Sequence, residues 1–189
     1  MPQAAGLVIP WITPRRDNGQ HLLGAIDQAR ADHAIRRYLC GVCGRPLRGQ
    51  PDDSTPARIV LLMRGSDLAS RCTVEPALHP QCAAYTATAC PMVAGRSAHY
   101  RRSPHPVDDT MVVGSDLERR LGAPAESWFA IWLTNYEIGV RNGLTVASYQ
   151  HIEPLRIRPI GRSAALLDLL VRSLPETLDA ETSRAGPQP

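Results

Sequence analysis

The spacing of apolar residues predicts a strand and then a helix at the beginning of the chain. Residues 7–12, LVIPWI, form a short apolar run that is typical of a strand, and Asp17-Asn18-Gly19 is a turn signal. Over residues 22–39 apolar side chains recur at close to helical spacing, as Leu22, Ile26, Ala29, Ile35 and Leu39. This pattern predicts a helix that leads directly into Cys40.

A hairpin and a second helix are predicted between residues 58 and 90. Residues 58–64, RIVLLMR, are apolar and β-prone, and residues 71–75 can return as a second strand. Residues 79–90 are typical of a short helix, because Pro80 is tolerated in a first helical turn and Pro91 stops the helix. Prolines therefore mark both ends of this helix.

The second half of the chain predicts a small antiparallel sheet and a closing helix. Residues 128–134 are strongly apolar, and residues 144–149 and 155–160 continue as strands, the last alternating apolar and basic positions. Leucines at helical spacing predict a C-terminal helix over residues 164–174. Residues 176–189 are polar, and we expect them to form a disordered tail.

Three cysteines and one histidine have the spacing of a tetrahedral zinc site. Cys40-x-x-Cys43 is followed by Gly44, which permits the tight turn that lets backbone amides approach the sulfur atoms. His79-x-x-Cys82 stands at the start of the predicted helix, where the positive helix end favours a thiolate. Because four protein ligands leave no position for water, we expect a structural zinc ion.

The two remaining cysteines, Cys72 and Cys90, are interpreted as small buried apolar residues. Cys90 lies eight residues beyond Cys82, which is about 12 Å along a helix axis. Whether Cys72 or Cys90 replaces one of the four proposed ligands stays open. A redox role for the C-x-x-C pair is the other alternative, although nothing around it is typical of a βαβ thioredoxin unit.

Length and composition predict one zinc-stabilised domain. The chain has 189 residues, of which 43% are hydrophobic and 21% charged, a normal globular balance. We expect an α+β protein with a treble-clef-like zinc module over residues 36–95, a flanking helix, and C-terminal strands and a helix over residues 111–174. Residues 1–175 should fold as a unit, because the C-terminal part alone is too short to bury much core.

Four segments, VIPWI, CGVCGRPL, RCTVEPALHPQCAAYTATACP and HYRR, resemble a family of uncharacterised bacterial and phage-associated proteins. The likeness covers residues 7–103 and implies a small bacterial zinc-binding protein without an established activity. Gly41 stands where the family usually has tryptophan, which leaves the ligands intact and changes the surface beside them. The resemblance also implies cysteines at the places of Cys72 and Cys90, which argues against dismissing these two residues.

A basic loop follows the predicted zinc helix. Arginines bind phosphate in a bidentate manner and a tyrosine ring stacks on a base, so the loop is a candidate surface for nucleic acid or another anion. The residues that would carry this role are Arg96, Tyr100, Arg101 and Arg102. A solvated loop kept irregular by prolines is the plainer interpretation of the loop itself. The function hypothesis is a non-enzymatic binding module that contacts nucleic acid or a protein partner.

The rival hypothesis is a metal-dependent nuclease or hydrolase on a treble-clef scaffold. Asp108 and Asp109 could form a second metal site with His99 and His105. Nucleases of this kind need a histidine base on the hairpin, and residues 44–78 contain none. We therefore assign no catalytic residue. The sequence also lacks a nucleophile–base motif, a glycine-rich phosphate loop and a dinucleotide fingerprint, so no organic cofactor is expected.

Composition and charge exclude some classes of chemistry and of partner. All 21 basic residues are arginine, which excludes chemistry that depends on a lysine amine. The net charge of +3 permits an anionic partner without arguing for one. No apolar run approaches the roughly 20 residues that span a bilayer, and the N-terminus lacks a secretory pattern. We expect a cytoplasmic protein with no membrane partner, whose cysteines serve a metal before disulfides.

The aromatic and charged residues of the later strands are interpreted as structural residues and not as parts of a binding site. Trp128 and Trp132 share one face of a predicted strand, and core packing is favoured over a ligand platform. His151 and Glu153 share another strand face and could pair there, although one such pair is weak evidence of a function. Arginines at 156 and 158 are interpreted as the wet face of an edge strand, where charge blocks sheet extension.

Overall fold

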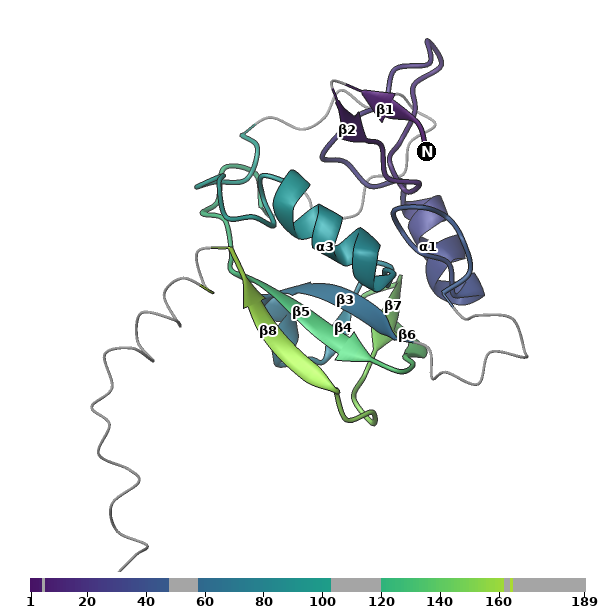
Figure 1. Cartoon of the computed structure of the whole chain (residues 1–189), viewed down its shortest axis with the longest axis vertical. Coiled ribbons are helices and arrows are strands. Elements are labelled where there is room, and N and C mark those ends of the chain that lie inside the picture. Colours follow the sequence, from purple (N-terminus) through teal and green to yellow (C-terminus); the bar gives the residue numbers. More distant parts are fainter. Residues whose placement is uncertain (5, 48–57, 103–119, 162–163, 165–189) are drawn as a thin grey trace, which may run out of the picture.

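The computed structural model describes residues 1–4, 6–47, 58–102, 120–161 and 164. This part of the chain contains helices and antiparallel sheets joined by loops (Figure 1). The helices are α1 (Gln28–Arg37), α2 (Gly65–Leu68) and α3 (Pro80–Ala89). The strands are β1 (Gln3–Ala4), β2 (Leu7–Val8), β3 (Ile59–Arg64), β4 (Cys72–Thr73), β5 (Trp128–Leu133), β6 (Glu137–Arg141), β7 (Leu144–Ser148) and β8 (Arg156–Ile160). The predicted α+β class is confirmed. No helix of the described residues is long and apolar enough to cross a membrane.

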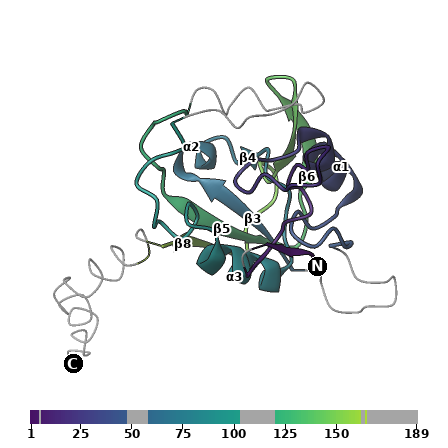
Figure 2. The same cartoon turned by 90° about the horizontal axis from the view of Figure 1, so that it is seen from above.

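The central element is a three-stranded sheet in the order β3-β5-β8. Every residue of β3 is buried, because both faces of this strand are covered by other elements. In Figures 1 and 2, α3 lies across one face of the sheet, and α2 and β4 lie on the opposite side. The register aligns Leu61 with Ile131 and Ile131 with Ile157, so apolar side chains run across the sheet.

The second sheet has the order β4-β7-β6 and is built around a tight hairpin. Asn142 and Gly143 join β6 to β7 with φ angles of 51° and 76°. Two successive positive φ angles define the turn that suits the right-handed twist of a two-residue hairpin. The apolar runs did not predict β6. The Asn-Gly pair is the sequence signal that indicates this strand.

Helix α1 is shorter than predicted from residues 22–39. It begins after Asp27, whose side chain accepts a hydrogen bond from the backbone N–H of Arg30 at 3.1 Å. It ends at Tyr38, which adopts the left-handed conformation with φ 52°. Gly24, with φ 85°, already turns the chain away from a helix before Asp27. The prediction of a helix running into Cys40 was therefore wrong at its first turns.

The predicted helix over residues 79–90 is confirmed as α3. His79 is the N-cap residue and Pro80 occupies the first turn, where its missing N–H leaves no broken bond. Ala83 is buried against the central sheet, within the same core as Val60 and Leu62. Thus α3 joins the cysteine–histidine region to the largest sheet.

The predicted hairpin between residues 58–64 and 71–75 is wrong. β3 pairs with β5 over six residue pairs, whereas β4 pairs with β7 over two. The long apolar ladder buries more surface than a hairpin with a two-residue strand would, and α2 separates the two candidate strands. For the same reason the later strands divide between two sheets instead of forming one.

The remaining predictions concern the first strand, the edge strand β8, two tryptophans and the C-terminal segment. The strand expected over residues 7–12 is limited to Leu7–Val8. On the edge strand β8 the arginines are exposed as predicted, but Ile157 is also 47% exposed, so the expected alternation of wet and dry faces is absent. Trp128 is buried and Trp132 packs against the core, as predicted. The predicted helix over residues 164–174 and the tail of 176–189 lie outside the described residues, apart from Ala164.

Candidate metal centre

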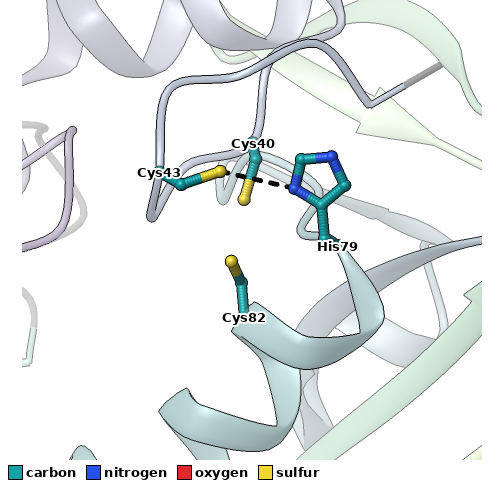
Figure 3. A group of neighbouring side chains, drawn as sticks. All are labelled: Cys40, Cys43, His79 and Cys82. Atoms are coloured by element: carbon teal, nitrogen blue, oxygen red, sulfur yellow. Dashed lines mark hydrogen bonds between the residues drawn. The ribbon is translucent and has the colours of Figure 1, made fainter. Parts of the chain in front are cut away.

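The first ligand pair lies on a tight loop between α1 and the central sheet. Leu39 and Pro46 form an antiparallel bridge at its base. Inside it, the Cys40 N–H donates to the Arg45 carbonyl and the Gly44 N–H donates to the Cys40 carbonyl, each at 2.8 Å. This narrow turn, which we call the knuckle (Leu39–Pro46), directs the side chains of both its cysteines to one side (Figure 3).

Gly44 is required in the knuckle for two physical reasons. Its φ of 70° lies in the left-handed region that favours glycine. A Cβ at this position would also lie 2.7 Å from Cδ1 of Trp11, which packs over the knuckle. The backbone N–H of Trp11 donates to the Val42 carbonyl at 2.8 Å and fixes this residue beside the knuckle. The C-x-x-C-G pattern indicates the turn at Gly44, but no sequence signal indicates its contact with Trp11, 33 positions earlier in the chain.

The second ligand pair is positioned by the start of α3. His79 precedes the helix and Cys82 lies in its first turn. Leu78, the residue before His79, exchanges two backbone hydrogen bonds with Val60 of β3, at 2.9 and 2.8 Å. The start of the helix is therefore anchored to the central sheet, opposite the knuckle.

The four predicted ligands converge, as their spacing predicted. One ligand atom from each of Cys40, Cys43, His79 and Cys82 lies within 4.8 Å of the other three. Figure 3 shows the sulfur atoms and the imidazole turned toward a common point. A tetrahedron with zinc–sulfur bonds of about 2.3 Å has edges of roughly 3.8 Å, so small side-chain adjustments close this group around one ion.

The imidazole of His79 is oriented by a backbone carbonyl. Its Nε2 lies 2.9 Å from the carbonyl oxygen of Pro46, and its Nδ1 lies 3.4 Å from the sulfur of Cys43. A carbonyl oxygen only accepts, so Nε2 carries the proton and Nδ1 presents its lone pair to the ligand cluster. An outer hydrogen bond of this kind is typical of metal-bound histidines.

Two thiols of the cluster, those of Cys40 and Cys82, are poor acids without a cation. Burial raises the pKa of Cys40, while hydrogen bonds from the backbone N–H groups of Val42, Cys43 and His79 to the sulfur oppose that shift. Burial, followed by the nearby sulfurs of Cys40 and Cys43, raises the pKa of Cys82 to about 12. A redox-active thiol needs a lowered pKa, whereas a divalent cation removes the repulsion seen here. The electrostatics therefore favour a metal site.

Neither Cys72 nor Cys90 belongs to this cluster. Cys72 is buried in β4, with its sulfur 3.6 Å from a guanidinium nitrogen of Arg141. Cys90 is half-buried and ends α3, where its N–H donates to the Thr86 carbonyl at 3.0 Å. Within the part of the chain that the structure describes, no second group of three or more metal-binding side chains is found.

Two of the four residues proposed for anion binding in the loop after α3 make contacts within the fold, and the other two have exposed side chains. The guanidinium of Arg96 donates to the carbonyls of Thr88 and Ala89, at 2.8 and 3.3 Å, and so caps the end of α3. Tyr100 is half-buried, and its hydroxyl donates to Glu126 at 3.4 Å. Burial, together with the charge of Glu126, raises the pKa of Tyr100 to about 12. The side chains of Arg101 and Arg102 are exposed.

The residues proposed for a second metal site are only partly described. His99 is exposed and bridges to Pro124. His105, Asp108 and Asp109 lie outside the described residues.

The predicted pair of His151 and Glu153 is wrong. These residues lie in a loop between β7 and β8 and share no strand face. His151 instead lies 2.9 Å from Glu137, and Glu153 lies 3.9 Å from Arg71.

Comparisons with models of protein families, with curated proteins and with solved structures gave no match. The resemblance to an uncharacterised bacterial family therefore stays a prediction.

Proposed function

We propose that this chain is a zinc-stabilised, non-enzymatic module that binds nucleic acid. The observation that supports it most is the pair of exposed side chains of Arg101 and Arg102 in the loop after α3. The chain has a formal charge of +3, and arginine supplies all of its permanent positive charge. Such a charge is compatible with a polyanionic partner.

Most of the described arginines are exposed. Eleven of those described are exposed, namely Arg15, Arg36, Arg37, Arg45, Arg58, Arg96, Arg101, Arg102, Arg141, Arg156 and Arg158. The planar guanidinium binds phosphate oxygens in pairs and keeps its charge at any physiological pH. Arg101 and Arg102 are adjacent and exposed, and they lie in the loop whose sequence indicates an anion-binding surface.

Zinc is the proposed metal, with a structural role. Three thiolates and one imidazole suit Zn²⁺ better than they suit hard cations such as Mg²⁺ or Ca²⁺. Four protein ligands complete a tetrahedron and leave no place for a reacting water. The treble-clef likeness is proposed for the knuckle and the ligand-bearing start of α3 alone, because β3 and β4 do not pair. A reducing cytoplasm would keep these thiols available.

The test is the salt dependence of binding, measured by fluorescence anisotropy with single-stranded DNA, duplex DNA and RNA between 50 and 200 mM salt. Replacing Arg101 and Arg102 together by glutamine should weaken binding and reduce the salt slope by about 1.4–1.8. The variant with Arg156→Gln and Arg158→Gln is a charge-matched control on β8. An equal loss in both variants would assign binding to the general charge rather than to the loop.

Other outcomes identify the other function classes. An absence of binding to all three nucleic acids at 50 mM salt excludes nucleic acid and leaves a protein partner. Turnover of a nucleic acid with added Mn²⁺ or Mg²⁺ would instead support the nuclease hypothesis. We expect none, because four protein ligands would leave the ion at Cys40, Cys43, His79 and Cys82 no position for a reacting water.

A further inference from the structure

Strand β6 is the outer strand of the second sheet. It pairs with β7 on one side, and no strand of the described residues pairs with its other side. Ile138 and Val140 of β6 are 40% and 70% exposed, although both side chains are apolar and β-branched. An exposed apolar edge strand is a template for pairing with another strand. Such a strand is either protected by its own sequence or covered by a partner.

The backbone of β6 directs hydrogen-bonding groups away from its sheet. Arg141 and Leu144 flank the two-residue turn, and a turn of this kind joins its flanking residues by backbone hydrogen bonds. The direction of the backbone groups alternates along an antiparallel strand, so Gly139 also faces β7. The N–H and carbonyl groups of Ile138 and Val140 therefore face outward. Each of these two residues offers one donor and one acceptor to a further strand.

The edge strand β8 is protected in a way that β6 is not. Pro159 of β8 has no N–H to donate, and Arg156 and Arg158 would repel an antiparallel copy of the same strand. By contrast, β6 contains no proline, and its two charged residues, Glu137 and Arg141, have opposite signs. The sequence therefore protects β8 from pairing with another copy and leaves β6 unprotected.

The sequence of β6 is complementary to itself in the antiparallel direction. When two copies meet with Gly139 opposite Gly139, Glu137 of each copy lies opposite Arg141 of the other. The same register places Ile138 opposite Val140, whose outward backbone groups then bond to each other. Opposite charges and β-branched side chains are cross-strand pairs that stabilise a sheet. A second copy of this chain therefore matches the edge in charge, in apolar contact and in hydrogen bonding.

The present contacts of the two charged residues are compatible with this pairing. The side chain of Glu137 is 45% exposed, and one of its two carboxylate oxygens lies 2.9 Å from Nδ1 of His151. The other oxygen can accept a hydrogen bond from an arginine of a second copy. The exposed guanidinium of Arg141 lies 3.6 Å from the sulfur of Cys72, which is a weak acceptor. Neither contact has to be exchanged for a poorer one.

We propose that β6 pairs with β6 of a second copy of this chain and forms a dimer with two-fold symmetry. The two three-stranded sheets then become one continuous sheet. A single short edge buries little surface, so the dimer forms at high protein concentration and dissociates on dilution. The inference is independent of the proposed nucleic-acid binding, and its test uses no nucleic acid.

The first measurement is the mean molecular mass of the zinc-loaded chain, by sedimentation at protein concentrations between about 1 and 500 µM. The mean mass should rise from 20.6 kDa toward twice that value. In amide hydrogen exchange followed by NMR, the N–H groups of Ile138 and Val140 should exchange more slowly at the higher concentration, whereas that of Ile157 on β8 should not change. A mean mass that stays at 20.6 kDa overturns the proposal. Slow exchange at β6 in such a monomer would assign this edge to another part of the chain.

Charge variants test the register. Arg141→Glu places two carboxylates opposite each other at both ends of the pairing and should weaken dimerisation about tenfold. Combining it with Glu137→Arg restores opposite charges and should restore dimerisation. Arg158→Glu on β8 makes the same change in charge and should leave the equilibrium unchanged. A combined variant that dimerises no better than Arg141→Glu would overturn the proposal.

A variant of the apolar row tests the contact without altering the charged pair. Val140→Lys replaces a largely exposed side chain, so the fold should tolerate it, and it should abolish the rise in mass. Ile157→Lys on β8 is the matched control and should dimerise like the parent protein. Zinc content and melting temperature report whether each variant folds. Equal dimerisation of Val140→Lys and the parent protein would place the contact elsewhere and contradict the proposal.

Discussion

At the scale of single residues, the metal centre depends on a glycine as much as on its ligands. Gly44 permits a positive φ and makes room for Trp11 over the knuckle. The C-x-x-C-G pattern made the ligands and the glycine predictable from the sequence. The indole that fills the space could not be predicted, because the contact joins residues that are distant along the chain.

Gly44→Ala is expected to destabilise the protein by about 2–4 kcal/mol, since the left-handed conformation costs roughly 1–2 kcal/mol and the clash with Trp11 adds to it. Urea unfolding of the zinc-loaded chain measures the loss. Gly143→Ala is the control, because Gly143 has a similar φ of 76° with no atom within 4 Å of an added Cβ. Equal losses in the two variants would show that the indole contact contributes nothing.

Zinc binding at pH 7 is expected to release about two protons or more per ion. The pKa of Cys82 in the metal-free fold is raised to about 12 and that of Cys40 is also raised, so both thiols are protonated before the metal enters. Calorimetry in buffers of different ionisation enthalpy counts the protons. A release of fewer than one would contradict the raised pKa values.

The same shift gives the metal-free protein a pH dependence. The folded pKa of Cys82, about 12, exceeds the usual value of 9.0, so the folded state holds this proton more tightly than the unfolded state. The contribution is fully present below pH 9 and is lost as the pH rises to 12. Denaturation of the metal-free chain at pH 8 and pH 10.5 should show lower stability at the higher pH, and Cys82→Ser should reduce the difference.

At the scale of elements, local sequence signals were sufficient to locate helices and strands but not to predict which strands pair. Pro80 and Pro91 fix α3, and apolar runs locate β3 and β5. The partner of each strand follows from the total surface that a pairing buries, which no short window of sequence contains. The missed strand β6 is the exception, because its Asn-Gly turn was visible in the sequence.

Arg96 stabilises a whole element, because its guanidinium donates to the last carbonyls of α3. Arg96→Gln is expected to lower stability by about 0.5–1 kcal/mol through loss of this cap. Arg101→Gln should leave stability within about 0.5 kcal/mol of the parent and weaken nucleic-acid binding instead. Thermal melts beside anisotropy titrations distinguish the two arginines. If both replacements weakened binding equally and left stability unchanged, the sequence-based grouping of both arginines as anion contacts would be supported instead.

At the scale of the molecule, the metal centre and the sheet share one core. Cys40, Val42 and Ala83 belong to the same buried cluster as Leu61 and Ile131. The single domain over residues 1–175 stays a prediction. Chain length indicates one core, whereas the route that connects the ligand cluster to the sheet, through Leu78 and Val60, could not be predicted from the sequence.

Removal of the metal is therefore expected to destabilise the sheet together with the knuckle. A chelator should lower the melting temperature by at least about 10 °C, since a structural zinc contributes several kcal/mol to folding. Far-UV circular dichroism and tryptophan fluorescence should report one coincident transition before and after chelation. Two separate transitions would show that the sheet folds independently of the ligands.

The order in which the ribosome delivers these elements has a consequence of its own. The last ligand, Cys82, is synthesised 46 residues before β5 begins at Trp128, and β3 is complete 64 residues before its partner strand starts. At about 5–20 residues per second, β3, every residue of which is buried in the fold, waits roughly 3–13 s for β5. Metal capture can place α3 against one face of β3 during that interval. Zinc supply would then govern how many newly made chains escape aggregation, before it affects any finished molecule.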